Sequence, residues 1–285
     1  MDVLAVVILG GLSYGVVLFL VGMGLSLVLG LMGIVNAAHG VLFMAGAYFG
    51  LAVAKQTGHF WLGLAAAMAI GALAGLVIER GLLRRLYNHQ LEQILVTFGF
   101  MYIVTNLHLW IYGPRPKSAL VPQALAGSIL IGQFTFPVYR IAVIFAGGLL
   151  CLVLWYLQEK TKVGAIIRAG MDDPQMARGL GINLTPVNVG AFCLGAGLAG
   201  FAGFAGAPVL GGANLATGTE MFFTAIAVCI VGGVGSVQGA LAGALLIGVA
   251  TIFVGAYLPD MATYVTYMLM VIVLLFRPAG LLGAK

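Results

Sequence analysis

The sequence predicts an all-α fold, a polytopic transmembrane helical bundle of about eight or nine spans that includes possible re-entrant half-helices. Only 7% of its residues are charged and 62% are hydrophobic, whereas a soluble domain carries about 25% charged residues. Its 43 glycines fit close helix packing in a membrane, where small residues let helices approach one another. A membrane β-barrel would instead alternate apolar and polar residues along each strand.

The apolar segments follow one another along the whole chain. A helix needs about 20 apolar residues to cross the hydrocarbon core. Several segments are short or interrupted by glycine, and these are the candidates for half-helices. No stretch has the composition of a soluble domain, so residues 1–285 are expected to form a single transmembrane domain. The predicted spans are 3–29, 38–54, 61–79, 91–112, 139–157, 187–206, 221–236, 239–257 and 262–277.

The cations are distributed unequally between the two sets of connecting loops. Nine of the thirteen fall in one set, namely Arg80, Arg84, Arg85, Lys160, Lys162, Arg168, Arg178, Arg277 and Lys285. The other set holds Lys55, Arg115, Lys117 and Arg140. Because cytoplasmic loops carry the excess of Lys and Arg, the first set and the C-terminus are predicted to be cytoplasmic. Nine full crossings would place the N-terminus outside, and one re-entrant segment would reverse that side.

The longer outer loop, 113–138, is predicted to be extracytoplasmic. Near its end, apolar and polar residues alternate around Gly132, which predicts a small β-hairpin lying over the bundle. The cysteines, Cys151, Cys193 and Cys229, all lie in apolar segments without metal-ligand spacing. We expect them to be packing residues that form no disulfide.

The inner loop, 158–186, contains the signals of a short helix over about 174–180. Asp173 is a good N-cap, Pro174 suits the first helical position, and Gly181 suits a left-handed turn after the helix. Such a helix is too short to be stable alone. It is expected to expose Met176, Ala177 and Leu180. From these residues alone, a docking site for a partner protein and a loop packed on its own bundle remain equally open.

The same loop contains a spaced pattern formed by Thr161, Lys162, Gly164, Arg168, Ala169, Asp173, Pro174, Ala177, Gly181, Ile182 and Asn183. This pattern resembles the coupling loop of bacterial ABC importer permeases, and more narrowly that of the branched-chain amino acid permease family of the LivH type. Three further segments match in the same order along the chain: Gly33 to Tyr48 with its Asn36-Ala-Ala-His39-Gly40 core, Val231 to Gly239, and Phe276 to Leu281. Ala37 stands where the family usually has phenylalanine, which leaves room for a wider local cavity.

This resemblance implies a bacterial inner-membrane importer with several partners. These are two cytoplasmic ATPase subunits, a second related permease subunit and an extracytoplasmic substrate-binding protein. It also implies that the ATPase docks on 164–181, through the coupling residues Gly164, Arg168, Asp172, Asp173, Pro174, Ala177 and Gly181. No cofactor is expected in this chain, and ATP would be used by the partner subunits. A clustered basic face with aromatic residues is absent from the sequence, so nucleic acid is not an expected partner.

The sequence offers no chemistry of its own for driving transport. None of the five lysines follows a glycine, so the chain has no Gly-Lys-Ser/Thr phosphate-binding loop. Glu79, Glu92, Glu220 and Asp260 lie toward span ends, and no buried carboxylate stands out. Because ion-coupled carriers place charged groups inside the membrane, this pattern disfavours one. No histidine, cysteine or serine set has nucleophile spacing, so the chain is not expected to be an enzyme.

Several polar residues are candidates for a substrate path or gate. Asn36, His39 and Gly40 fall where one apolar run ends and the next begins. A broken helix exposes backbone groups that a membrane tolerates only inside protein or beside water, so this break is a candidate gate. Hydrogen bonding between helices explains these residues equally well. Thr97, Asn106 and Ser236 are the remaining candidates along the path.

The function predicted from these observations is that of a permease subunit of a binding-protein-dependent ABC importer. It would move a small amphipathic solute, with branched-chain amino acids as the leading class. Alternatives are a stand-alone ion-coupled carrier, a passive channel, or the same importer type for urea, amides or small aromatic acids.

Overall fold

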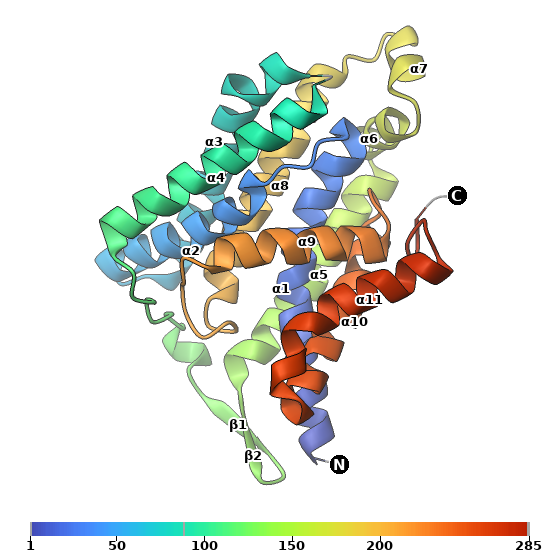
Figure 1. Ribbon diagram of the computed structural model, residues 1–285. Helices are drawn as coiled ribbons and strands as arrows, with labels where there is room; N and C mark the ends of the chain where they lie inside the picture. The colour runs from blue at the N-terminus through green and yellow to red at the C-terminus, as the bar shows by residue number, and fades with distance from the viewer. Residues whose placement is uncertain (1, 88, 284–285) are drawn as a thin grey trace.

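The computed structural model describes residues 2–87 and 89–283, and it confirms the nearly all-α bundle (Figure 1). Eight helices in this part of the chain are long and apolar enough to cross a membrane. The last of the eight reaches 18 residues only because the 3₁₀ turn Pro259–Met261 continues into α11. A ninth apolar helix, α9, has 16 residues. The nine correspond to the nine predicted spans: α1 (Asp2–Met32), α2 (Ala38–Thr57), α3 (Phe60–Gly81), α4 (Gln90–Tyr112), α5 (Val138–Lys160), α8 (Leu184–Gly206), α9 (Thr217–Gly232), α10 (Val237–Tyr257) and α11 (Ala262–Phe276).

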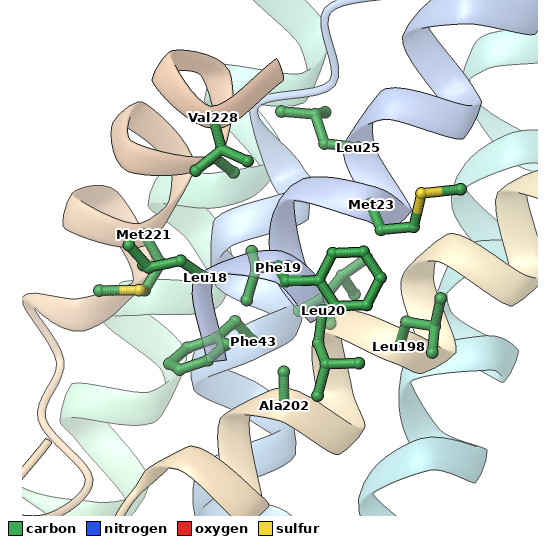
Figure 2. Packing of buried hydrophobic residues seen from close by; sticks show 14 of the residues in the cluster. Leu18, Phe19, Leu20, Met23, Leu25, Phe43, Leu198, Ala202, Met221 and Val228 are labelled. Carbon is green, nitrogen blue, oxygen red and sulfur yellow. The ribbon is translucent and has the colours of Figure 1, made fainter. Parts of the chain in front are cut away.

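Helix α1 forms the centre of the bundle because it is apolar on all sides, as expected for a buried helix. It packs against α8 and α10, and also contacts α9 and α5. Figure 2 shows Phe19 and Leu25 of α1 among side chains of α2, α8 and α9, and both are fully buried. Helices α2 and α3 pack on α8, whereas α4 lies at the periphery and contacts α2.

Glycine lets these helices meet backbone to backbone. A Cβ added to Gly24 of α1 would lie 2.6 Å from the carbonyl oxygen of Gly195 in α8, and one added to Gly195 would lie 2.6 Å from that of Gly24. Gly248 of α10 meets Gly15 of α1 in the same way, its added Cβ lying 2.5 Å from the Gly15 Cα. The many glycines therefore act as packing surfaces, as small residues do in other membrane proteins.

The two ends of the bundle differ (Figure 1). One end carries the predicted hairpin, formed by antiparallel β1 (Ser128–Ile131) and β2 (Phe134–Pro137), which contacts the start of α1. The opposite end carries two short helices, α6 (Lys162–Asp172) and α7 (Pro174–Gly179). We call these the outer and the inner end. The N-terminal residues of α1 lie at the outer end, beside the hairpin (Figure 1).

All three cysteine thiols are free. Cys151 and Cys229 are buried in the packed helices, and the Cys229 thiol donates to the Gly22 carbonyl oxygen over 3.3 Å. Their role as packing residues is that expected from the sequence.

Candidate functional site: a coupling surface, two helix breaks and two cavities

The break between α1 and α2 lies inside the bundle. Gly33 has a φ of +67°, which lets the chain turn back after α1. The Ala37 amide donates to the Thr97 hydroxyl of α4 over 3.2 Å, and the Ala38 amide donates to the Asn36 side-chain oxygen over 3.1 Å. Asn36 is 1% exposed, and its side-chain nitrogen has no partner among the described residues. The break is thus held by polar contacts in an apolar interior.

His39 connects this break to α1 by a hydrogen bond. Its Nε2 lies 2.9 Å from the Val21 carbonyl oxygen. Because a carbonyl oxygen only accepts, Nε2 carries the proton and donates it. Val21 lies eleven residues before the end of α1, about 16 Å along the helix axis. His39 therefore joins the start of α2 to the middle of α1.

Gly40 allows α2 and α9 to touch at their first turns. A Cβ at Gly40 would collide with the carbonyl oxygen of Gly218 and lie 2.7 Å from the Phe222 Cβ. Of the other predicted path residues, Thr97 meets this break, as described above. Asn106 instead lies exposed on the face of α4 that points away from the bundle, where its side-chain amide donates to the Tyr102 carbonyl oxygen over 2.8 Å. The structure therefore brings Asn36, His39, Gly40 and Thr97 together and leaves Asn106 apart.

A second break, Gly233 to Ser236, separates α9 from α10 at the inner end. Gly233 and Gly235 have φ values of +101° and +83°, and the Ser236 hydroxyl caps α10 by accepting from the Gly239 amide over 3.0 Å. Both backbone polar groups of Gly235 are hydrogen-bonded. Its N–H donates to the Ser26 hydroxyl of α1 over 2.8 Å, and its C=O accepts from Gln158 of α5 over 2.7 Å. We call residues 233–236 the elbow.

Two cavities lie at opposite ends of α9. An inner cavity of about 830 Å³ is lined by the elbow, by Arg168 and Met171 of α6 and by Leu29 and Gly30 of α1. An outer cavity of about 450 Å³ is lined by residues at the first turn of α9, including Glu220, and by Tyr14, Arg140 and Thr251. The packed core of Figure 2 includes Met221 and Val228 of α9. Ser236 lines the inner cavity, whereas Asn36, His39 and Gly40 are buried in this core.

Helix α6 is joined rigidly to α5. Thr161 caps α6 by accepting from the Gly164 amide over 3.1 Å. A Cβ at Gly164 would collide with the carbonyl oxygens of Leu157 and Gln158, so only glycine allows this sharp connection. The Arg168 guanidinium returns to donate to the Gln158 carbonyl oxygen and lies 3.5 Å from the Glu159 carboxylate. These contacts fix the start and the middle of α6 to the last turn of α5.

Gln158 connects α6 to the elbow, and the sequence interpretation missed it. The side chain is 8% exposed and bridges α5 to Gly235, while its backbone oxygen accepts from Arg168. A signal existed in the spacing, because Cys151, Leu154 and Gln158 lie on one buried stripe of α5. A glutamine that continues an apolar stripe at positions i, i+3 and i+7 is expected to face the core.

Helix α7 confirms the predicted short helix. The Asp173 carboxylate accepts from the Gln175 and Met176 amides, each over 2.9 Å, and Gly181 has a φ of +82°. Met176 and Leu180 are 65% and 73% exposed. The expectation that Ala177 is also exposed was wrong, since it is 3% exposed. Each residue turns a helix by about 100°, so Ala177 leaves the face shared by Met176 and Leu180. Asp172 is exposed beside this helix.

The expectation that no carboxylate is buried was also wrong. Glu79 of α3 is fully buried, and it accepts from the Tyr87 hydroxyl over 2.6 Å. It lies two residues before the end of α3 at the inner end. The buried stripe of α3 contains Gly63, Ala67, Gly71 and Gly75, and the same spacing of four continues to Glu79. The sequence interpretation considered only its distance from the span end, not the face on which it lies.

The C-terminal segment contacts the end of α9 and the start of the elbow. The Leu281 and Leu282 amides donate to the carbonyl oxygens of Val231 and Gly232 over 2.8 and 3.0 Å. These carbonyls belong to the last turn of α9, where no intrahelical donor is available. Gly280, with a φ of +81°, packs against Gly233. The tail motif Phe276 to Leu281 thus has a structural role at the end of α9.

The chain matches the family described as branched-chain amino acid transport system / permease component over residues 7–274. It is 27% identical to the high-affinity branched-chain amino acid transport system permease protein BraD of Pseudomonas aeruginosa, covering 97% of this chain and 94% of that one. It is 29% identical to LivH of Escherichia coli and 30% identical to LivH of Salmonella typhimurium, each alignment covering 96% of this chain and 93% of the relative. A fructose import permease protein, FrcC of Rhizobium meliloti, is 28% identical over 64% of this chain and 52% of its own length. No solved structure matches the chain.

Proposed function

The chain belongs to the family of branched-chain amino acid transport system permease components, and on that premise we propose that it is a transmembrane subunit of a binding-protein-dependent ABC importer. It is a multi-pass membrane protein, and its family is one of transport permeases, not of enzymes. We propose that two cytoplasmic ATPase subunits, a second related permease and an extracytoplasmic binding protein complete the importer. The inner end would then be cytoplasmic, with the C-terminus on that side of the bacterial inner membrane.

The connection between α6 and the elbow is the observation that carries this proposal. The coupling residues form two short helices, and α7 presents Met176 and Leu180 outward. Apolar side chains exposed on a short helix are typical of a surface that binds a partner. From this surface, Arg168 and Gln158 lead to Gly235 at the break between α9 and α10. ATP hydrolysis by the partner would move α6, and the elbow would follow.

Branched-chain amino acids are the proposed solutes. The relatives named BraD and LivH are permeases of branched-chain amino acid systems. The buried Asn36, His39, Gly40 and Thr97 would form the gate between the two cavities, with Ser236 at the inner exit. The importer would switch between outward and inward states through the differential affinity of its ligands for those states.

The proposal is tested by purification in mild detergent followed by mass spectrometry of the associated proteins. We expect ATPase subunits and a second permease to accompany the tagged chain. Proteoliposomes holding this complex should accumulate radiolabelled L-leucine only with ATP and the binding protein. A single polypeptide that transports leucine without ATP would instead establish a stand-alone carrier or channel.

Gly181→Val should disrupt the coupling surface without unfolding the bundle. A β-branched residue is strongly disfavoured at a φ of +82°, so the turn after α7 would change its path. We expect leucine uptake to fall about tenfold while membrane expression stays near normal. Gly179→Val is the matched control, because Gly179 lies on the same exposed helix without a positive φ and has open space around it. Equal uptake by both variants would refute the docking role of this turn.

Asn36→Leu should alter the gate while leaving ATPase association unchanged. Leucine has nearly the same size but cannot accept from the Ala38 amide, and an unsatisfied buried amide destabilises the break by about 1–3 kcal/mol. We expect a changed KM or maximal rate of leucine uptake, measured beside co-purification of the ATPase. Kinetics identical to those of the unsubstituted protein would reduce Asn36 to a packing residue.

A further inference from the structure

The outer cavity combines one cation, one anion and an apolar wall. Its volume of about 450 Å³ lies within the roughly 300–1,000 Å³ common for small-ligand sites. Arg140, in the first turn of α5, and Glu220, in the first turn of α9, both line it. The remaining wall includes Val209, Leu210, Met221 and Ile252. Opposite charges thus share one cavity with apolar side chains, and Tyr14, Asn214, Thr217 and Thr251 add polar groups to the lining.

Neither charge is neutralised by an ion pair with another described residue. The ion pairs in the described part of the chain join His89 to Glu92 and Arg168 to Glu159. Arg140 donates once, to the Val209 carbonyl oxygen over 3.1 Å, although a guanidinium has five N–H donors. The Thr251 hydroxyl, on the same cavity, is buried without a partner among these residues. The cavity therefore has hydrogen-bond donors without a partner among the described residues and an exposed carboxylate outside any ion pair.

The position of the cavity suits a solute that arrives from outside. Pro116 of the 113–138 loop contributes to its lining. The neighbouring Lys117 forms two backbone hydrogen bonds with Ala213, each of 2.9 Å, so this loop is fastened to the segment that leads into α9. The cavity lies at the hairpin end of the bundle, and its floor is the first turn of α9, which also touches Gly40.

We propose that the outer cavity is a receiving site for zwitterionic α-amino acids with apolar side chains. Arg140 would bind the α-carboxylate, with which a guanidinium pairs well, and Glu220 would bind the α-ammonium group. Val209, Leu210, Met221 and Ile252 would cover the side chain. The inference rests on the proposed importer function and adds the residues that recognise the solute. Urea and amides carry neither charge, so the charges of Arg140 and Glu220 would not favour their binding.

The test uses the complete importer in proteoliposomes, with L-leucine as the probe and saturating amounts of binding protein. Arg140→Gln and Glu220→Gln should each lower leucine transported per ATP hydrolysed about tenfold, because each removes a charge-assisted hydrogen bond. Assembly and basal ATP hydrolysis should stay unchanged. The additional hydrolysis evoked by leucine-loaded over empty binding protein should disappear. A purely structural role would change assembly or basal hydrolysis instead.

Arg115→Gln and Asp260→Asn are matched controls, since they remove exposed charges at the same end but outside the cavity lining. Both should transport leucine normally, and Arg140→Lys, which keeps the charge, should recover part of the loss. Normal leucine transport per ATP by Arg140→Gln and Glu220→Gln would overturn this inference and leave the importer function intact. Absence of leucine transport by the unsubstituted importer would overturn the proposed function and the receiving site together.

Discussion

Gln158→Leu is expected to uncouple ATP hydrolysis from transport. The variant cannot donate to the Gly235 carbonyl oxygen, and an unsatisfied buried carbonyl disfavours the packed elbow by about 1–3 kcal/mol. Helix α6 would still bind the ATPase, because Gln158 lies behind it and is buried. We therefore expect leucine transported per ATP hydrolysed to fall about tenfold, since 1.4 kcal/mol corresponds to a factor of ten.

The measurement compares leucine uptake and phosphate release in the same proteoliposomes. Gln56→Leu is the matched control, because it makes the same change at an exposed position of α2 and should behave as the unsubstituted protein. Ser26 gives an independent check, since its hydroxyl oxygen accepts a hydrogen bond from the Gly235 N–H. Ser26→Ala should thus also lower the ratio. An unchanged ratio in Gln158→Leu would show that the elbow does not receive the motion of α6.

Gly40→Ala should have a large effect on the fold itself. A methyl group there would collide with the Gly218 carbonyl oxygen and approach the Phe222 Cβ to 2.7 Å. Backbone atoms cannot move aside as a flexible side chain can, so α2 and α9 must separate. Overpacking of this kind typically destabilises by about 1–3 kcal/mol. We expect a lower melting temperature in detergent and a reduced yield of monodisperse protein.

Gly99→Ala provides the contrast, because Gly99 lies in the middle of α4 with open space around it. Alanine there favours a helix by about 1 kcal/mol over glycine, so its melting temperature should be equal or higher. Size-exclusion profiles and thermal melts of the two variants test whether the close contact at Gly40 stabilises the fold. Similar melts for Gly40→Ala and Gly99→Ala would mean that the contact between α2 and α9 is not essential to the packed state.

The sequence was sufficient to predict the elements that depend on local patterns. Apolar length located the nine helices, and the alternation around Gly132 predicted the hairpin. The signals at Asp173 and Gly181 predicted α7. Each of these features is encoded within a few neighbouring residues, so no knowledge of the tertiary structure was needed.

The parts that were missed depend on which face of a helix a residue occupies. Gln158 and Glu79 are polar residues near helix ends, where a sequence suggests solvent, yet both lie on buried stripes. The outer cavity joins Tyr14, Arg140 and Glu220 from three helices far apart in the chain. Only the packing of α1, α5 and α9 brings these side chains together. Asn106 shows the reverse, since a polar residue within a span faces outward.

The contacts of α1 with α8 and α10 have a consequence for how the bundle deforms. At Gly24 and Gly195, and again at Gly15 and Gly248, the glycines bring the backbones of the two helices into direct contact. Interlocked side chains resist sliding because each must leave its groove before it enters the next. Two smooth backbone surfaces lack that barrier at the points of contact. Shear between packed helices is one of the known modes of conformational change, and a shift of α8 or α10 along α1 would require no rotamer change at these four glycines.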